Sequence, residues 1–459
     1  MENTSTVQLG TFSSTLRFED IPEEVITKAK FLLLDYLGGM LPGNKETMGK
    51  ILFEFVTEVT GTAESRILGM DTKVGAQWAG LYNGAVGHLI DMDDIHWPSV
   101  THAGVCIWST ALAMAEKTKA TGKDILTSAI AGYEVATRIG LAVEPDHYVR
   151  GYNPSGTIMT FGAAAVAARL MKLDPIKATH ALGMAAVMAA GNRAHLTERC
   201  MTKDYNSGFS SKSGIMGALL AEKGFTASTD ELENPLGFLH VYGNRTYPEE
   251  LTRGLKEVWH IMNTGQKLYP ACRAMHSSID AVLSIRDQVK PEQIEKITTR
   301  IFATGANIVD DNEPWRGNKG IMGLRFSAQF NMAVALLYGM DGLWKLYDAE
   351  NAMWYLNDEQ VRSLIGCIKL IHVKEWDEDT NKYSACELTV HLKDGSILER
   401  NLANAMGDPE IPIPPEDQIK RFKSLVSICD WSAERTDAVI NTVLELPQIE
   451  DCEELMCNL

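Results

Sequence analysis

The sequence predicts a mainly α protein, in which a large all-helical domain is interrupted by a smaller α+β domain. Apolar residues recur at helical spacing through residues 1–265, the pattern changes to strand-like alternation within residues 266–403, and helical spacing returns in residues 404–459. Because helices flank the mixed segment on both sides, we expect the C-terminal tail to rejoin the first domain. A chain of 459 residues is long enough for this arrangement.

The first half of the chain is predicted to be a succession of helices. Pro22 stands at a helix start, and apolar residues then recur every three or four positions until Gly38 and Gly39, where we expect the helix to end. Further helices are expected over residues 47–60, 74–92, 105–121, 124–143, 157–172, 175–191 and 211–223. They are rich in alanine and glycine, which let helices approach one another closely.

The middle segment has the signals of a sheet. Alternating runs cover residues 296–303, 368–373 and 388–392. The last run leads into Asp394-Gly395, a strong hairpin signal, so we expect a return strand from Ile397. Helices are expected over residues 277–289 and 327–338 within this segment, and over residues 415–427 and 433–445 after it.

Composition and charge exclude several classes of protein. The net charge of −17 argues against a nucleic-acid partner. The eight cysteines form no C-x-x-C pair, so no zinc or iron–sulfur site is expected, and a reduced, cytoplasmic protein is the simplest interpretation. The N-terminus lacks the features of a secretory signal, and no apolar run approaches the ~20 residues of a membrane span.

Three carboxylates and two imidazoles lie close together between residues 83 and 104. His88, Asp91 and Asp94 are spaced at i, i+3 and i+6, so a helix would place them along one face, and His102 follows shortly after. Such a cluster suits acid–base chemistry, or a metal ion such as Mn, Fe or Zn, although no established metal-binding spacing is present. A structural role is also open, in which Asp93 or Asp94 caps a helix or pairs with a buried arginine.

Two polar segments come directly before predicted helices. The loop after Tyr148 contains Asn153 and the run Pro-Ser-Gly-Thr, whose free N–H groups would favour an anion. A plain helix cap at Ser155 or Thr157 explains this loop as well. Lys203 lies in the second segment, where burial would lower its pKa and make it a base. The alternative is an ordinary surface lysine.

A fourth segment places Lys267, Arg273 and His276 around a Tyr-Pro turn. Arginine binds carboxylates through two parallel hydrogen bonds, so this segment could hold an anionic substrate. It could equally be a set of exposed charges beside a turn. Cys272 lacks the sequence signature of a catalytic cysteine, so we assign it to the wall of a site.

In this order and spacing, the four segments resemble the MmgE/PrpD family. The resemblance runs from about residue 20 to the C-terminal helices, and its more specific elements are D-x-D-D at residues 91–94 and Y-P-x-C-R-x-x-H at residues 269–276. Further matching segments are residues 34–38, 83–84, 101–102, 153–157, 161–164, 201–203, 224–226 and 232–233. The family includes 2-methylcitrate dehydratase, cis-aconitate decarboxylase and iminodisuccinate epimerase.

The resemblance implies a helical domain of two sequence-separated pieces, a smaller α+β lid domain, and an active site between them. It implies a small di- or tricarboxylate substrate, a homodimer, and no metal or organic cofactor. Residues implied at the reacting centre are Asp91, His102 and Lys203. Residues implied to anchor carboxylates from the lid are Lys267, Arg273 and His276.

Some positions depart from the family pattern. Asn153 and Asn206 stand where the family usually has histidine, and an amide cannot transfer protons at neutral pH. Cys272 and Phe330 stand where the decarboxylase has histidine and tyrosine. Tyr148 falls where the epimerase has a tyrosine proposed as an acid/base group.

These observations leave four hypotheses open. The first is a lyase that dehydrates a substrate like 2-methylcitrate, with Lys203 or His102 as the base. The second is an epimerase in which Tyr148 and Lys203 exchange protons on opposite faces of the substrate. The third is an enzyme like cis-aconitate decarboxylase. The fourth is a scaffold without catalytic activity, suggested by Asn153 and Asn206.

Overall fold

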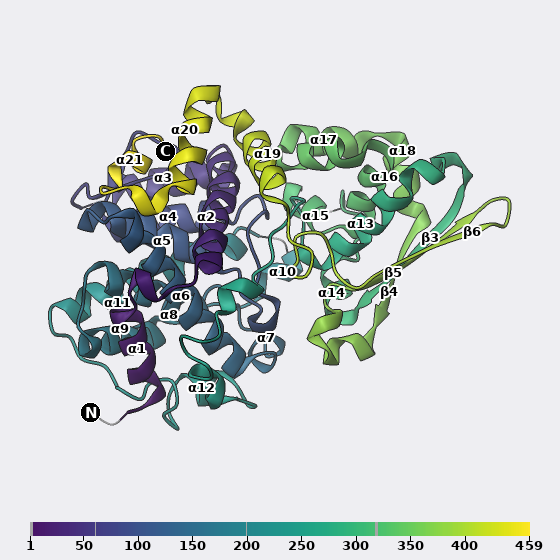
Figure 1. The fold of residues 1–459 in the computed structure, drawn as a ribbon. Helices are drawn as coiled ribbons and strands as arrows, with labels where there is room; N and C mark the ends of the chain where they lie inside the picture. The colour runs from purple at the N-terminus through teal and green to yellow at the C-terminus, as the bar shows by residue number, and fades with distance from the viewer. Residues whose placement is uncertain (1–2, 60, 199, 317–319) are drawn as a thin grey trace.

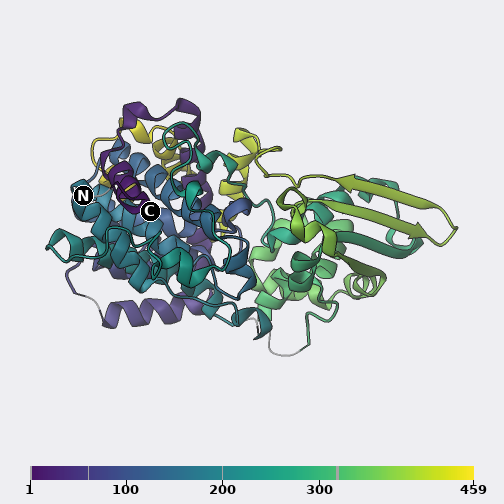
Figure 2. The ribbon, with the colours of Figure 1, turned by 90° about the horizontal axis from the view of Figure 1, so that it is seen from below.

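The protein is mainly helical and has one small mixed sheet, which confirms the predicted fold class. The computed structural model describes residues 3–59, 61–198, 200–316 and 320–459. Figure 1 shows a helical body and, beside it, an α+β part whose sheet ends in the hairpin of β5 (Cys386–Leu392) and β6 (Ile397–Leu402). This hairpin extends away from the helical body (Figure 2).

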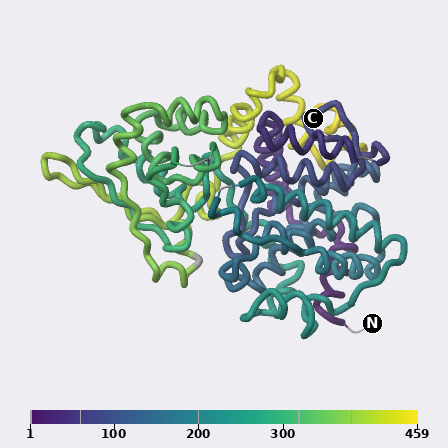
Figure 3. Tube along the Cα trace, turned by 180° about the vertical axis from the view of Figure 1, so that it is seen from behind, coloured from purple at the N-terminus to yellow at the C-terminus, as the bar shows by residue number. Residues whose placement is uncertain are grey.

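The helical body contains segments from both ends of the chain. Its helices are α1 (Ser5–Thr15), α2 (Glu23–Gly43), α3 (Thr47–Glu58), α4 (Ala76–Gly87), α5 (Ala103–Thr118), α6 (Gly122–Val143), α7 (Asp146–Val149), α8 (Ile158–Leu170), α9 (Pro175–Met188), α10 (His195–Glu198), α11 (Thr202–Glu222), α12 (Phe238–Tyr242), α19 (Pro415–Val426), α20 (Ala433–Leu444) and α21 (Glu453–Met456). Strands β1 (Ser65–Arg66) and β2 (Lys73–Val74) form a small antiparallel pair. One hydrophobic core joins side chains from Leu9 to Ile261 with others from Phe422 to Leu459. The C-terminal tail therefore packs in the helical body, as Figure 3 shows.

The α+β part has a hydrophobic core of its own, with side chains from Tyr269 to Val390. Its elements are α13 (His276–Ile285), β3 (Ile294–Phe302), α14 (Ala303–Val309), α15 (Gly320–Arg325), α16 (Ala328–Trp344), α17 (Ala349–Asn357), α18 (Glu359–Cys367), β4 (Ile368–Val373), β5 and β6. The strand order is β4-β3-β5-β6, with β3 parallel to β4 and antiparallel to β5. The predicted Asp-Gly hairpin forms, and Gly395 has φ +86°, which glycine adopts without strain. We propose domain boundaries after residues 265 and 403.

Helix α2 differs from its prediction, because it continues past Gly38 and Gly39 to Gly43. A Cβ atom at Gly38 would lie 3.2 Å from the side chains of both Phe422 and Leu425 on α19. The glycine therefore allows a close approach between helices and does not end one. Residue 60, the predicted end of α3, lies outside the described residues. The helices that lie outside the predicted ones are α1, α7, α10, α12, α14, α15, α17, α18 and α21. In the described part of the chain, no helix combines the length and apolarity that crossing a bilayer requires.

Candidate active site

A cavity of about 850 Å³ is lined by residues of both the helical body and the α+β part. Eight of the nine residues that the sequence singles out lie in its wall: Asp91, His102, Tyr148, Asn153, Lys203, Lys267, Cys272 and Arg273. The ninth, His276, is fully buried outside the wall. The cavity therefore gathers residues from all four segments of the sequence.

Asp91, together with the neighbouring Asp93 and Asp94, lies in a turn that follows α4. The helix ends at Gly87, and Asp91 has a left-handed backbone with φ +58°, a conformation that aspartate tolerates better than most residues. The prediction that a helix aligns His88, Asp91 and Asp94 on one face is therefore wrong. Remote arginines hold the turn: Arg325 donates to Leu89 O at 2.5 Å, and Arg421 donates to Met92 O at 3.0 Å.

Asp91 binds two lysine ammonium groups on the cavity wall. Its Oδ1 accepts hydrogen bonds from Lys203 Nζ and Lys267 Nζ, each at 3.0 Å. Burial would raise the pKa of this carboxyl, but the two positive charges outweigh burial and hold the pKa below its usual 3.8. Asp91 is therefore ionised at neutral pH and fixes both ammonium groups in place.

Lys203 lies in the first turn of α11, because this helix begins at Thr202 and not at the predicted residue 211. Burial alone would lower its pKa, as the sequence suggests. The carboxylates of Asp91 and Asp204 outweigh burial, so the pKa of Lys203 is raised above its usual 10.5. The expectation of a lysine poised as a neutral base is therefore wrong. Lys203 is a buried cation that can stabilise negative charge or donate a proton.

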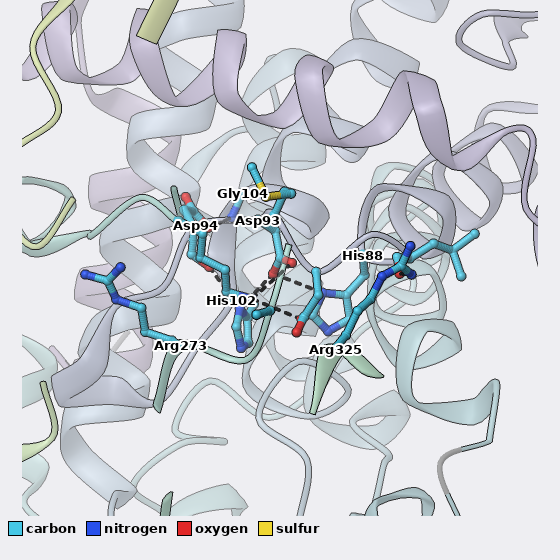
Figure 4. A network of polar contacts seen from close by, with 12 residues as sticks. His88, Asp93, Asp94, His102, Gly104, Arg273 and Arg325 are labelled. Carbon is cyan, nitrogen blue, oxygen red and sulfur yellow. Dashed lines mark hydrogen bonds and ion pairs between the residues drawn. The ribbon is translucent and has the colours of Figure 1, made fainter. Parts of the chain in front are cut away.

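Asp93 lies between two imidazole rings, as Figure 4 shows. Its Oδ2 is 2.9 Å from His88 Nδ1 and 2.7 Å from His102 Nδ1. His102 Nδ1 also donates to Asp94 O at 2.9 Å, and in the neutral tautomer with this bond Nε2 is the acceptor nitrogen. The side chain of His102 is 22% exposed, whereas that of His88 is buried. His102 is therefore the imidazole that can exchange a proton with a substrate.

The metal alternative from the sequence takes His88, Asp91, Asp94 and His102 as ligands. The structure instead groups His88, Asp93 and His102, whose ligand atoms lie within 4.8 Å of one another. These residues could hold a metal ion by donor type and spacing. However, Lys267 Nζ lies 3.6 Å from Asp93 Oδ1 and already supplies positive charge there. An added divalent cation would be repelled by this ammonium group, so the charge pattern favours the site without a metal.

Asp94 has a structural role, in agreement with the helix-cap alternative. Its Oδ1 accepts a hydrogen bond from Gly104 N at 2.7 Å, in the first turn of α5, and its Oδ2 accepts one from Tyr133 Oη at 2.6 Å. Burial raises the pKa of Asp94 to about 7, although these two hydrogen bonds by themselves would lower it. A Cβ atom at Gly104 would lie 2.8 Å from Asp94 Oδ2, so a side chain there would disturb the cap and with it the carbonyl that holds His102.

The loop around Asn153 does not offer free N–H groups to an anion. Asn153 Oδ1 accepts a hydrogen bond from Ser155 N at 3.0 Å, and Asn153 O accepts from Gly156 N and Thr157 N at 2.9 and 3.1 Å. The anion expectation is therefore wrong for these groups. Thr157 occupies the N-cap position of α8, as the alternative supposes, but its side chain makes no capping hydrogen bond. On the same wall, burial raises the pKa of the Tyr148 hydroxyl, so this group is protonated at neutral pH.

The guanidinium group of Arg273 is bound by other residues of the protein. It forms an ion pair with the buried Asp408, donates to Met406 O at 3.1 Å, and lies 3.0 Å from His276 Nδ1. His276 Nε2 in turn donates to Ala271 O at 3.1 Å. This geometry does not support the expected roles of Arg273 and His276 as carboxylate anchors. It supports a structural role for both residues, with Arg273 in the cavity wall and His276 outside it.

Comparison with known proteins now identifies the family. Residues 7–250 match the MmgE/PrpD N-terminal domain, and residues 269–446 match the MmgE/PrpD C-terminal domain. The chain belongs to the MmgE/PrpD family. The two matches together cover most of the chain and include the turn that contains His88, Asp91 and Asp93 as well as residues 269–276.

Curated relatives of this MmgE/PrpD protein extend over nearly its full length. A cis-aconitate decarboxylase-like protein, oryM, of Aspergillus oryzae is 27% identical, over 99% of this chain and 97% of the relative. Cis-aconitate decarboxylase of Aspergillus terreus is 25% identical, over 98% and 95%. Cis-aconitate decarboxylase of Homo sapiens is 26% identical, over 96% and 91%.

Sequence reasoning missed several residues in the wall of this MmgE/PrpD site. His195 is buried, and its Nδ1 has no hydrogen-bond partner among the residues that the structure describes. Burial first, and then the charges of Lys203 and His88, lower the pKa of His195 to about 4, so it is neutral at pH 7. Arg193 places its guanidinium 3.5 Å from the Tyr148 ring centre. The sequence signal that could have indicated them is the Gly191-Asn192 turn. This turn interrupts the helices, and the titratable side chains of Arg193 and His195 follow it directly.

Replacing Arg273 by methionine is expected to destabilise the protein more than it weakens substrate binding. The change leaves the buried Asp408 carboxylate without its partner, which costs about 3–5 kcal/mol of the free energy of unfolding. Urea denaturation measures this loss. Arg300→Met is the matched control, because its ion pair with Glu387 is half-exposed and contributes about 0–1 kcal/mol. A stable Arg273→Met variant with a strongly raised KM would instead show that Arg273 binds the substrate.

Proposed function

We propose that this protein is a lyase that acts on a small tricarboxylate and breaks a bond next to a carboxylate group. The observation that carries the proposal is the pair of ammonium groups, Lys203 and Lys267, on Asp91 in a cavity that His102 also lines. Breaking such a bond leaves an electron pair on the neighbouring carbon. Fixed cations where this charge develops lower the barrier, because they are already oriented and shielded from water.

The reaction that we propose first is loss of carbon dioxide, because the relatives described above are named as cis-aconitate decarboxylases or as decarboxylase-like. The carbon–carboxylate bond breaks and CO₂ leaves. The electron pair of the broken bond stays on the substrate and moves into the adjacent unsaturated system. A proton must then reach the carbon that receives the pair. The ammonium group of Lys203 is placed to supply this proton, and solvent restores it afterwards.

Dehydration is the second candidate, and the free ring nitrogen of His102 favours it. His102 Nε2 would remove the proton next to a carboxylate, and Lys203 would protonate the departing hydroxyl group, which leaves as water. This needs one base and one acid on the same cavity wall, and both are present. The assignment of Lys203 as the base is not kept, because its raised pKa keeps it protonated.

The other two hypotheses have less support. An epimerase of the Tyr148/Lys203 kind needs one of these groups deprotonated, whereas both have raised pKa values. A scaffold would not require two buried lysines to be held on one carboxylate beside a partly exposed imidazole.

A single experiment separates the reactions. The purified protein is incubated in D₂O with cis-aconitate and, separately, with 2-methylcitrate, and both solutions are followed by proton NMR and by release of CO₂. We expect CO₂ and a deuterium-labelled unsaturated dicarboxylate from cis-aconitate. An alkene signal from 2-methylcitrate without CO₂ would favour the dehydratase, and deuterium exchange without net product would favour the epimerase. No change with either acid would contradict the proposed lyase.

Replacing His102 by asparagine is expected to lower kcat by 10²–10⁴-fold, because this is the usual contribution of a positioned acid–base group. The fold should survive, since His102 is partly exposed and the amide can still donate to Asp94 O. Steady-state kinetics measure the loss. His180→Asn is the matched control, because this histidine binds Ala227 O in the helical body away from the cavity. Near-normal kcat in His102→Asn would remove His102 from the mechanism.

We also propose that the protein is a cytoplasmic homodimer that needs no metal or organic cofactor. Light scattering after size-exclusion chromatography tests the dimer, and fluorescence microscopy of the tagged protein tests the compartment. Dialysis against EDTA tests the cofactor proposal. Activity lost on dialysis and restored by Mn²⁺, Fe²⁺ or Zn²⁺ would favour a metal at His88, Asp93 and His102.

A further inference from the structure

We propose that the cavity has a second, apolar region that binds a hydrocarbon substituent of the substrate, longer than a methyl group. We call this region the aromatic subsite and define it by Trp97, Phe302 and Tyr383, which all line the cavity. This proposal rests on the proposed lyase function and names the substrate more closely, as a tricarboxylate with an alkyl chain.

The three rings of the aromatic subsite form one continuous wall. Phe302 and Tyr383 are stacked with ring centres 4.7 Å apart. The Trp97 ring meets them edge-on, at 6.0 Å from Phe302 and 5.8 Å from Tyr383. Trp97 belongs to the helical body, whereas the other two belong to the α+β part, so both parts of the protein build this wall.

The polar atoms of this wall are already satisfied within the protein. Trp97 Nε1 donates to Ser384 Oγ at 3.1 Å, and the Tyr383 hydroxyl donates to Asp377 O at 3.0 Å. The aromatic subsite therefore offers carbon to the cavity and no free donor from these two groups. Further apolar side chains in the lining are Ile95, Val100, Val149, Leu196, Ile308 and Phe326. Such a surface stabilises hydrocarbon and gives little to a carboxylate.

The aromatic subsite belongs to the same cavity as the charged centre, which we define as Asp91, Lys203 and Lys267. Cys272 and Tyr148 line this cavity as well. A ligand with its carboxylates at Lys203 and Lys267 therefore shares one cavity with the aromatic subsite.

The size of the cavity supports the same conclusion. Its volume of about 850 Å³ lies in the upper part of the roughly 300–1,000 Å³ range of sites for drug-sized ligands. An unsubstituted six-carbon tricarboxylate is much smaller than such a ligand and would leave the aromatic subsite in contact with water. An alkyl chain would displace this water and bury apolar surface on both sides.

The test measures binding and turnover of a graded series: citrate, 2-methylcitrate, 2-butylcitrate and 2-hexylcitrate. Dissociation constants come from calorimetry, and products from NMR. Each buried methylene group contributes about 0.8 kcal/mol, so Kd should fall by up to about fourfold per added carbon until the subsite is filled. A Kd that does not change, or that rises, with chain length would overturn the aromatic subsite even if the short acids are turned over. A Kd that falls without turnover of any acid, including the corresponding aconitates, would support the subsite and contradict the proposed lyase.

Two variants test whether the dependence of Kd on chain length arises at the aromatic subsite. Thr304→Phe puts a ring into the same part of the lining, and Tyr383→Ala removes part of the wall from a half-buried position. Both should reduce the ratio of the Kd for 2-methylcitrate to that for 2-hexylcitrate by at least fivefold. Trp354→Ala is the matched control, because this tryptophan is 59% exposed on α17 and outside the cavity. An unchanged ratio in both variants, with folding confirmed by circular dichroism, would contradict the assignment.

Discussion

Replacing Lys203 by methionine is expected to lower kcat by about 10³-fold or more while the protein remains folded. Lys203 provides one of the two buried positive charges on Asp91 and is the proposed proton donor. Loss of one preorganised electrostatic group costs 10²–10³-fold, and loss of proton transfer costs 10²–10⁴-fold. Steady-state kinetics with the substrate identified by NMR measure the effect.

The fold should tolerate Lys203→Met because neither neighbouring carboxylate is left in a costly state. Asp91 keeps the hydrogen bond from Lys267 at 3.0 Å. Asp204 has a pKa raised to about 7 by burial, even with Lys203 beside it, so without the lysine it takes up a proton and becomes neutral. Methionine also fits the volume of the lysine stem. Thermal denaturation at pH 7 should therefore give a Tm close to that of the wild type.

Two further variants separate charge from geometry at Lys203. Lys212→Met is the matched control on the same helix, where Lys212 lies 4.6 Å from the Trp78 ring centre and outside the cavity wall. It should keep full activity. Lys203→Arg keeps the charge but donates its protons reluctantly, because a guanidinium has a pKa above 12. Substrate binding with little turnover in Lys203→Arg would support proton donation by Lys203. Full turnover in Lys203→Met would remove Lys203 from the chemistry.

The fold was largely predictable because the strongest local patterns agree with the tertiary structure. Strand β4 occupies the predicted residues 368–373, and the Asp394-Gly395 hairpin forms as expected. Boundaries failed where a glycine has a tertiary role. Gly38 looks like a helix end in the sequence, but it lies in a helix and makes room for α19, a segment almost 400 residues away. Local spacing carries no information about such a partner.

The site was predictable as a set of residues but less well as a set of roles. Residue type and order gathered Asp91, Lys203 and Lys267 correctly in one cavity. The protonation of Lys203 depends on two carboxylates in space, one of them 112 positions away in the chain, and the sequence could not indicate this balance. For Arg273, no motif indicates the buried ion-pair partner, because Asp408 lies outside all of them.

Replacing Asp91 by asparagine is expected to abolish most activity and also to destabilise the protein, by up to about 3–5 kcal/mol. Asparagine accepts the left-handed backbone at this position, so no backbone strain is added. What is lost is the negative charge shared by Lys203 and Lys267. Burial then lowers the pKa of Lys203, and only the carboxylates of Asp204 and the more distant Asp93 still raise it. The catalytic ammonium should therefore lose its proton at lower pH than in the wild type.

The pH dependence of this variant provides the sharpest check on the mechanism. The wild-type carboxyl has a lowered pKa, so its contribution to stability is complete above its usual 3.8 and is lost only as the pH falls further. The pKa of Lys203 is raised, so its contribution to stability is complete below pH 10.5 and is lost as the pH rises further. The stability difference between wild type and Asp91→Asn should therefore be largest between these two values. Residual kcat of the variant should rise, relative to that of the wild type, as the pH is lowered and Lys203 recovers its proton.

Asp430→Asn is the matched control for Asp91→Asn, because Asp430 has the same left-handed backbone, with φ +56°, but a side chain that is 90% exposed. Its ion pair with Lys45 is a surface contact, so both stability and pH profile should stay within experimental error of the wild type. An Asp91→Asn variant with a wild-type pH profile would mean that the charge of Lys203 does not depend on Asp91. In that case the paired ammonium groups could not be the feature that directs this cavity towards carbanion chemistry, and the proposed function would have to rest on His102 alone.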